Sequence, residues 1–427
     1  MKQPLLQMTT LIEKYIKNIK IRQFFSLFGA MVINVPLGIA ISILLTNNMS
    51  VKNYGDYQFV FNFYNFIIPF FYIGIFTSVS RLVALDSNKN VLKNYIGFNI
   101  SYSLFVFIVY SILIIVFLLF FYEKMYPKDI KWIMYIILPF SISIVFKNSI
   151  ETLLIGLNDI YKFSILQVFP KIIFVTGIYI LLLSSKLTTQ NVLTFRFVCI
   201  LLIIFFIIIK LKPNFNFKEY PVKQVIRENK NLGFQVYLSF LANTGTNRIS
   251  FILISYYLGN ESLAIFSLAK VITKPLSFIP TVLGNIFFKN FTNAGYIKNK
   301  IIYLITIISI VSFTLFVIFI NKVFFLVYPT SYELSLQYSY YFAFASIARG
   351  YGDFFNRFLV ANGLGNIVRN NSIYVGIINL LGFSILIKYF SITGAAVTMI
   401  IANMFYLTRN IYLYKKIPSV KKYYSIG

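Results

Sequence analysis

Histidine is absent from the 427-residue sequence, which has only one cysteine, Cys199, and one tryptophan, Trp132. These absences exclude His-dependent catalytic triads, metal sites built from His and Cys, and intramolecular disulfides. Acidic residues are also few, with 12 Asp and Glu against 39 Lys and Arg. We therefore predict a protein that is not an enzyme, with no catalytic residues, no metal site and no cofactor.

Charge of either sign is scarce, and apolar residues take its place. Charged residues make up 12% of the chain, compared with about 25% in soluble domains. Hydrophobic residues make up 58%, and the mean hydropathy is +0.77. Apolar runs of about 20 residues recur along the whole length, and each can cross a bilayer core of about 30 Å. The chain is therefore predicted to be an integral membrane protein.

Apolar windows bounded by Gly, Pro, Asn and charge define twelve predicted membrane-spanning helices. The first six are expected at about 21–46, 57–80, 94–121, 131–157, 163–184 and 192–210, and the second six at about 231–258, 262–288, 300–327, 334–361, 369–388 and 392–414. The predicted organisation is a basic N-tail (1–20), a six-helix bundle (21–210), a polar linker (211–230), a second six-helix bundle (231–414) and a basic C-tail (415–427). The fold class is all-α and polytopic.

The net charge of +27 is distributed along the chain as a topology signal. Tails and loops on the N-terminal side of the membrane hold far more Lys and Arg than the opposite loops, so both termini are predicted to be cytoplasmic. Because basic residues alternate with apolar spans, no nucleic-acid partner is expected. The N-tail is either an amphipathic helix on an anionic membrane surface or a disordered basic tail, and we expect no removable signal peptide.

Two helix junctions indicate an internal repeat. The segment IGLNDIYK matches GLGNIVR when Gly156 is aligned with Gly363, an offset of 207, and a similar offset places Pro69 over Pro280. An even number of helices separates the matched positions, so both halves share one orientation, as in a parallel repeat. The alternative is chance similarity between Gly- and Asn-bearing loops.

Four stretches carry a resemblance to a known family. They read NYGDYQFVFNFYNFIIPFFYIGIFTSVSRL (53–82), IGLNDIYKFSILQ (155–167), YYLGNESLAIFSLAKVITKPLSFIPTVL (256–283) and YFSITGAAVTMIIANM (389–404). Each motif is weak alone, but with the twelve-span layout they cover nearly the whole chain. The sequence thereby resembles the polysaccharide repeat-unit flippases of the multidrug/oligosaccharidyl-lipid/polysaccharide (MOP) exporter superfamily.

This resemblance implies two six-helix bundles around a central cavity, in the bacterial inner membrane. It also implies movement of an undecaprenyl-pyrophosphate-linked oligosaccharide, the repeat unit of O-antigen or another surface polysaccharide, from the cytoplasmic to the outer leaflet. Expected partners are that lipid-linked oligosaccharide, the bilayer and other membrane proteins of polysaccharide assembly. Many relatives carry an acidic residue shortly after the position of Arg248, where this chain has Ser250, so an ion-pair role at this position is not carried over.

Arg248 lies deep in the seventh predicted span. At about 100° per residue it falls on the border of a polar arc that includes Asn243 and Asn247, while the opposite arc is apolar. A charge at mid-bilayer costs about 2.5–3.5 kcal/mol, so it normally faces protein or water. Arg248 is therefore expected either to face the cavity or to pair with carbonyls or a neighbouring helix.

Further charges follow in the second half. Lys270 and Lys274 are four residues apart and share a helix face just before Pro275. Arg349, Asp353 and Arg357 recur at the same spacing, so Asp353 can bridge both arginines. That stripe is either a self-satisfied ion ladder that fixes helix packing or a substrate contact.

The first half offers fewer deep charges. Lys147 and Glu151 are four apart and predicted to pair, and Lys171 is a single mid-span lysine. Arg196 is close enough to the outer end of its span to snorkel to the headgroups. Arg81 is either a cytoplasmic anchor or a ligand.

The second half therefore carries the larger excess of deep positive charge, and a cationic cavity suits a pyrophosphate. The candidate substrate-binding cations are Arg248, Lys270, Lys274, Arg349, Arg357, Lys171 and Arg81, supported by Asn243, Asn247, Asp353 and Glu151. The hypothesis is alternating access, driven by H⁺, Na⁺ or the membrane potential. The alternatives are a drug/cation antiporter of the same superfamily, a membrane glycosyltransferase or polysaccharide polymerase, and a structural scaffold.

Overall fold

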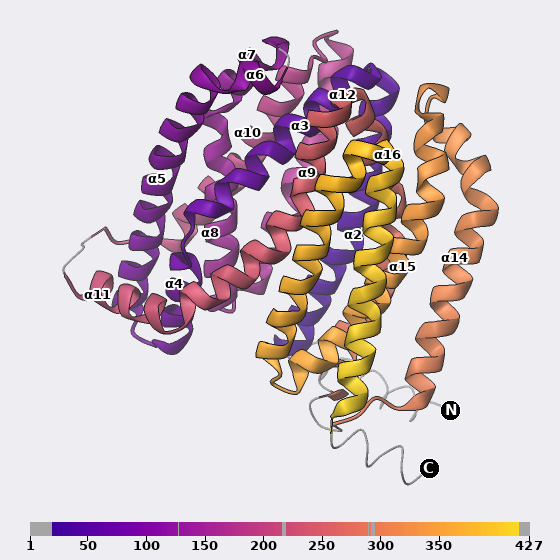
Figure 1. Ribbon diagram of the computed structural model, residues 1–427. Coiled ribbons are helices and arrows are strands. Elements are labelled where there is room, and N and C mark those ends of the chain that lie inside the picture. The colour runs from indigo at the N-terminus through magenta and orange to yellow at the C-terminus, as the bar shows by residue number, and fades with distance from the viewer. Residues whose placement is uncertain (1–18, 127, 216–218, 289, 292–294, 418–427) are drawn as a thin grey trace, which may run out of the picture.

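The computed structural model describes residues 19–126, 128–215, 219–288, 290–291 and 295–417, and it is helical from end to end (Figure 1). The first half contains α2 (Ile19–Asn48), α3 (Val51–Ile67), η1 (Ile68–Phe71), α4 (Ile75–Leu85), α5 (Lys89–Phe120), α6 (Tyr122–Met125), α7 (Lys128–Ile137), η2 (Pro139–Ser141), α8 (Ile142–Gly156), α9 (Ile160–Leu183) and α10 (Thr189–Leu211). The second contains α12 (Phe234–Ile286), α14 (Asn299–Val327), η4 (Thr330–Tyr332), α15 (Glu333–Ala361) and α16 (Gly365–Lys416). Most of the predicted N-tail and C-tail lies outside the described residues.

Two of these helices each contain two spans. At 1.5 Å per residue, the 53 residues of α12 and the 52 of α16 would extend about 80 Å, more than twice a bilayer core. Non-helical backbone at Gly259 (φ 82°) and Ser391 (φ 55°) reverses the chain instead. The rings of Phe251 and Phe266, on either side of Gly259, lie 5.4 Å apart. With these reversals counted, the twelve predicted spans all fall on described helices, which confirms the fold class.

Two spans are broken, which the apolar windows do not predict. The second span bends by 66° between η1 and α4, at Gly74, and the fourth bends by 53° at Pro139. Gly74 has a φ of 81°, and a Cβ there would lie 2.6 Å from the carbonyl oxygen of Gly233. Left-handed backbone and close packing therefore both require glycine at this break.

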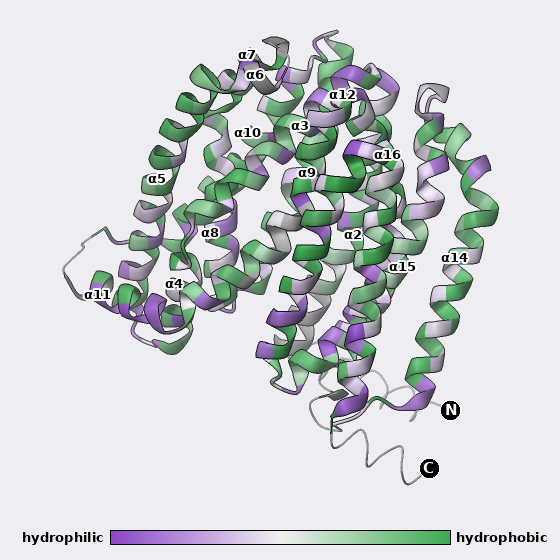
Figure 2. Cartoon of the chain, in the orientation of Figure 1, coloured by the Kyte–Doolittle hydropathy of each residue, from purple (hydrophilic) through white to green (hydrophobic). Residues whose placement is uncertain are grey.

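The outer surface of the bundle is apolar, as Figure 2 shows along α5, α10 and α14. Large side chains such as Phe105 (59%), Phe205 (66%) and Leu326 (83%) are exposed on these helices. Proteins dissolved in water rarely expose so many large apolar side chains on neighbouring helices. Such a surface therefore marks contact with lipid. The protein is therefore a multi-pass membrane protein.

The junctions after α8 and α15, on which the predicted internal repeat rests, end in the same kind of turn. After α8, Asn158 takes the left-handed conformation, with hydrogen bonds from Asn158 N to Ile155 O and from Asp159 N to Leu154 O. After α15, Gly363 takes it, and Gly363 N and Leu364 N repeat both bonds. Ser185 N and Lys186 N make the same two bonds after α9, so this turn is a common helix ending, and the repeat with its offset of 207 stays a prediction.

The predicted linker contains a helix, α11 (Glu219–Glu228), followed by the short π-helix η3 (Asn229–Gly233), which leads into α12. Glu228 pairs with Arg81 on α4, and Asn229 donates a hydrogen bond to the carbonyl of Ile73. The linker is therefore docked on the first half, and the first arm of α12 crosses between the two sets of helices (Figure 1).

The two halves touch at the end where α2 finishes and α3 begins, termed the α2–α3 end. Ser42 on α2 hydrogen-bonds the hydroxyl of Tyr328 at 2.9 Å. Asn260, just after the turn at Gly259, donates to a carboxylate oxygen of Asp56 at 2.6 Å. A Cβ on Gly55 would lie 1.9 Å from the carbonyl oxygen of Asn260. The α2–α3 end is therefore closed by close backbone packing and hydrogen bonds.

Candidate functional site

Arg248 links the two halves of the molecule. It lies on the first arm of α12 and donates a hydrogen bond to Oδ1 of Asn62, a buried side chain on α3. Its guanidinium is half-buried and, among the described residues, has no carboxylate partner. Of the polar arc predicted beside it, Ser250 is fully buried, while the side chains of Asn243 and Asn247 lie outside what the structure describes.

Lys270 and Lys274 lie on the second arm of α12, on the face predicted from their spacing. The ammonium of Lys270 lies 4.7 Å from the ring centre of Phe251 and 5.3 Å from that of Phe266. An ammonium over an aromatic face is attracted by the ring quadrupole. Lys274 is exposed, one residue before Pro275.

These cations belong to one field that spans both halves. Lys270 is repelled by Arg248 and by Lys274. Lys274 is also repelled by Lys147 of the first half, and Lys171 is repelled by both Lys274 and Lys147. The sequence predicts the individual charges, and the structure connects the two sets through Lys274, which is within electrostatic range of cations from both halves.

Two first-half cations have partners. The predicted pair of Lys147 and Glu151 is confirmed at 3.6 Å, and Glu151 also accepts a hydrogen bond from Gln167 at 2.8 Å. Lys171 donates to the backbone carbonyl of Asn34 on α2 at 3.3 Å. A carbonyl partner leaves the charge of Lys171 uncompensated, whereas Glu151 offsets that of Lys147.

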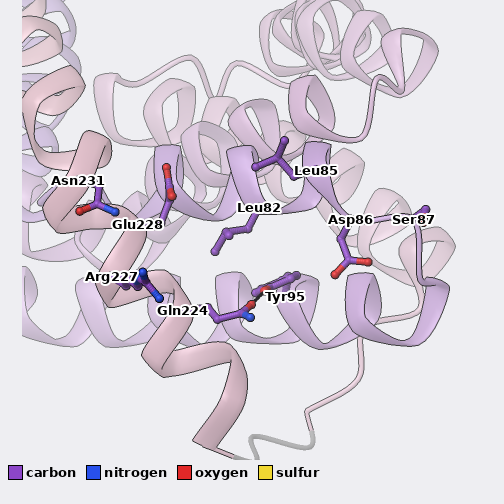
Figure 3. A pocket seen from close by; sticks show the side chains of 9 residues that line it. All are labelled: Leu82, Leu85, Asp86, Ser87, Tyr95, Gln224, Arg227, Glu228 and Asn231. Atoms are coloured by element: carbon purple, nitrogen blue, oxygen red, sulfur yellow. Dashed lines mark hydrogen bonds between the residues drawn. The ribbon is translucent and has the colours of Figure 1, made fainter.

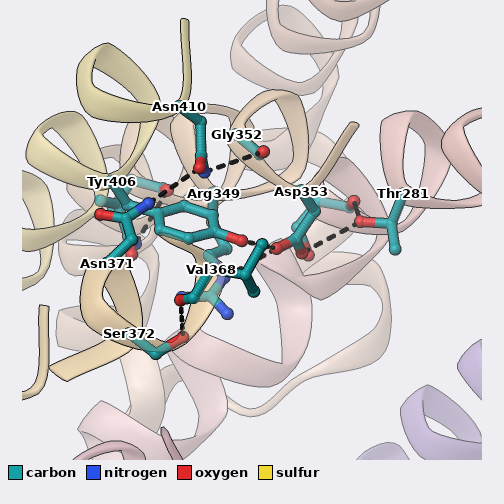
Figure 4. A network of polar contacts seen from close by, with 12 residues as sticks. Thr281, Arg349, Gly352, Asp353, Val368, Asn371, Ser372, Tyr406 and Asn410 are labelled. Atoms are coloured by element: carbon teal, nitrogen blue, oxygen red, sulfur yellow. Dashed lines mark hydrogen bonds and ion pairs between the residues drawn. The ribbon is translucent and has the colours of Figure 1, made fainter. Parts of the chain in front are cut away.

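Asp353 is the centre of a closed polar network (Figure 4). Its Oδ1 lies 3.3 Å from Nε of Arg349 and accepts from the Tyr406 hydroxyl at 2.9 Å, while Oδ2 accepts from Thr281 at 3.2 Å. The guanidinium of Arg349 also stacks on the Tyr406 ring, 4.3 Å from its centre. This arrangement favours the structural ion ladder over a substrate contact for Arg349 and Asp353.

The prediction that Asp353 bridges both arginines of the stripe is wrong. Among the described residues it pairs only with Arg349, because its second oxygen accepts from Thr281. Arg357 packs its stem on α12, where a Cβ on Gly284 would lie 3.2 Å from the Arg357 Cγ. Arg357 therefore lies outside the polar network.

The surroundings of Arg81 favour its interpretation as a cytoplasmic anchor over a role as a substrate ligand. Its side chain is 46% exposed and pairs with Glu228 of α11 at 2.7 Å. Beside this pair, α4, α5 and α11 enclose a pocket of about 400 Å³ whose lining includes Asp86, Gln224 and Arg227 (Figure 3). None of the deep cations lines this pocket, which lies at the opposite end of the second span from the α2–α3 end.

The sequence does not predict the contacts of Arg196. It was expected to snorkel to the headgroups, but its guanidinium carbon lies 3.7 Å from the ring centre of Phe61, between α3, α9 and α10, and it donates to the Tyr57 hydroxyl. The aromatic face competes successfully with the headgroups for the guanidinium. Nothing in the sequence near Arg196 indicates that it contacts residues about 135 positions away in the chain.

Comparisons with known proteins agree with this architecture. Residues 21–287 match the model of a family described as polysaccharide biosynthesis protein. None of the curated protein sequences matches the chain at a significant level. The family match confirms the resemblance read from the motifs.

Solved structures share the fold at low identity. The lipid II flippase MurJ in an inward closed conformation has a TM-score of 0.70 at 14% identity, covering 95% of this chain and 90% of that one. An inward-facing multidrug resistance MATE transporter of the MOP superfamily has a TM-score of 0.65 at 14% identity, covering 90% and 98%. A MOP transporter from Pyrococcus furiosus, described by the reverse polarity of its binding pocket, has 0.59 at 14%, covering 94% and 96%. The chain therefore belongs to the polysaccharide biosynthesis protein family, and its fold is that of the MOP-superfamily transporters.

Proposed function

We propose that this protein is a flippase that carries a polyprenyl-pyrophosphate-linked oligosaccharide repeat unit across the bacterial inner membrane. The repeat unit belongs to O-antigen or another surface polysaccharide, and it moves from the cytoplasmic to the outer leaflet by alternating access. Both termini face the cytoplasm, so the α2–α3 end is the outer end. Membership of the polysaccharide biosynthesis family supports the proposed flippase function.

The observation that carries the proposal is the charge imbalance of the cation cluster. In the second half, Arg248, Lys270 and Lys274 repel one another, and Lys274 is also within electrostatic range of Lys147 and Lys171 of the first half. Only Lys147 is offset by a carboxylate among the described side chains of this cluster. Several cations at membrane depth are costly unless an anion or water accompanies them. A pyrophosphate supplies two or more negative charges and many acceptor oxygens.

The remaining parts of the substrate fit the same arrangement. The prenyl chain stays in lipid while the headgroup passes between the halves. The cycle needs no resident cofactor, and H⁺, Na⁺ or the membrane potential supplies the driving force. Other polysaccharide-assembly membrane proteins deliver and collect the substrate.

The alternatives fit less well. A drug/cation antiporter would bring a cation into a field that repels it. A glycosyltransferase or polymerase is expected to have a large outer loop or a metal-binding acidic motif, and the described residues hold no group of three or more potential metal ligands. Both alternatives therefore lack a supporting observation.

The test is a strain that lacks the gene, complemented with single variants. Loss of the protein is expected to trap lipid-linked repeat units on the inner leaflet and to abolish the surface polymer. Wild type should restore the polymer, whereas Arg248→Gln and Lys274→Gln should not, at equal protein level. Lys322→Gln, the same charge change on exposed α14, is the matched control and should complement fully. Full complementation by Arg248→Gln and Lys274→Gln would contradict the proposal.

A further inference from the structure

Two arginines from opposite halves lie against neighbouring residues of α3. Arg248, on α12, donates to Asn62. Arg196, on α10, stacks on Phe61 and donates to the hydroxyl of Tyr57. Tyr57 and Phe61 are one helical turn apart, so they form a continuous aromatic face. The helix α3, which forms the first part of the second span, thus holds one guanidinium from each half.

Neither arginine is neutralised by its partners. Arg248 contacts an amide oxygen, and Arg196 contacts a phenol hydroxyl and aromatic rings, all of them uncharged. Within the described part of the chain, no carboxylate lies within ion-pair distance of either guanidinium, and the two groups repel each other. The stacked arginine of the second-half network differs, because Arg349 has Asp353 beside it.

Both arginines lie more than one helical turn from the helix ends at the α2–α3 end. Arg196 is seven residues from the start of α10, and Arg248 is eleven residues before the turn at Gly259. At 1.5 Å per residue these positions lie about 10 and 16 Å from the α2–α3 end along their helices. Arginine stays protonated in proteins, so both charges persist at this depth.

We propose that Arg196 is a second anion-binding residue, which together with Arg248 clamps the pyrophosphate of the lipid-linked substrate between the two halves. The assignment rests on the proposed flippase function and names the group by which the substrate is selected. Each phosphoryl group can accept two parallel hydrogen bonds from one guanidinium, so a diphosphate matches two arginines and a monophosphate matches one. The bound diphosphate replaces the repulsion between the arginines with attraction, and it thereby holds α10 and α12 together on α3.

The test measures binding of short prenyl probes to the full-length protein in detergent micelles. Farnesyl pyrophosphate, farnesyl monophosphate and farnesol share the prenyl chain and differ in charge. Wild type should bind the pyrophosphate most tightly and farnesol most weakly. Arg196→Gln should weaken pyrophosphate binding by about tenfold or more, since it removes charge-assisted hydrogen bonds. The same variant should leave farnesol binding unchanged and reduce the preference for pyrophosphate over monophosphate.

Two further variants separate the effect of the Arg196 charge on pyrophosphate binding from the effect of its side-chain packing. Arg409→Gln removes another aromatic-stacked arginine, 4.3 Å from the ring centre of Tyr374 in α16, and should bind the pyrophosphate as wild type does. Arg196→Lys keeps the charge but loses the paired donors, so it should bind the pyrophosphate more tightly than Arg196→Gln and less tightly than wild type, and it decides the matter if Arg196→Gln fails to fold. Combining Arg196→Gln with Arg248→Gln should cost less than the product of the two single effects, because both act on one ligand.

The outcomes separate this assignment from the function on which it rests. If Arg248→Gln loses the pyrophosphate preference while Arg196→Gln keeps it, the clamp is refuted and the flippase proposal stands. A folded Arg196→Lys protein that binds the pyrophosphate no better than farnesol would also refute the clamp. If wild type binds the three probes equally, the proposed pyrophosphate substrate itself is refuted.

Discussion

Closure of the α2–α3 end depends on a glycine that has no room for a side chain. A Cβ at Gly55 would lie 1.9 Å from the carbonyl oxygen of Asn260 and 2.5 Å from its carbonyl carbon, whereas ordinary contacts begin at 3.4 Å. Gly55→Ala must therefore move α3 away from the turn at Gly259 by more than an ångström. Overpacking of this kind costs about 1–3 kcal/mol.

This cost falls only on the state in which the two halves touch at that end. If the protein alternates between states closed and open there, Gly55→Ala shifts the balance towards the open state by about five- to 150-fold. The readout is the reactivity of a single cysteine. Ser42→Cys, made in a Cys199→Ser background, places a thiol at a position that is 2% exposed in the closed end.

The assay follows maleimide labelling of this cysteine in detergent. Labelling should be slow with Gly55 present and about five- to 150-fold faster with Gly55→Ala, provided that closed molecules dominate. Gly38→Ala is the matched control, because a Cβ there meets nothing within 4 Å. Equal labelling rates for Gly55→Ala and Gly38→Ala, in folded protein, would refute the closure described for this end.

Other predictions concern the second-half network, a strained turn and the linker. Asp353→Asn leaves Arg349 without its carboxylate and should lower the free energy of unfolding by about 3 kcal/mol, with partial rescue by adding Arg349→Gln; an unchanged melting temperature would contradict a structural role for the pair of Arg349 and Asp353. Ser391→Gly should raise the melting temperature, because it relieves about 1 kcal/mol of strain at a φ of 55°. Glu228→Gln breaks a pair in which Arg81 is 46% exposed, so a change in stability above about 1 kcal/mol would be unexpected.

Hydropathy was sufficient to place the spans, because each must supply about 20 apolar residues whatever its partners. Hydropathy does not predict the breaks at Gly74 and Pro139, because a broken span and a straight span can have the same composition. Hydropathy does not predict the helix α11 either, because a polar helix docked on a neighbouring helix has the same composition as a linker.

Local spacing predicted contacts along one helix and nothing beyond it. The pair of Lys147 and Glu151 follows from four-residue periodicity, and so does that of Arg349 with Asp353. The partners of Arg248 and Arg196 lie on α3, 186 and 139 residues away in the chain. Such contacts depend on how whole helices pack, and a single sequence carries no signal for them.

Translocation by the purified protein in liposomes tests the central claim most directly. A fluorescent prenyl-pyrophosphate-linked oligosaccharide placed in both leaflets is quenched from outside, and the fraction that becomes accessible is followed with time. Wild type is expected to translocate the substrate, Arg248→Gln to lose translocation, and Lys322→Gln to keep the normal rate. Equal rates for all three proteins, or equal transport of an uncharged prenyl-linked oligosaccharide, would contradict recognition of the pyrophosphate by the cation cluster.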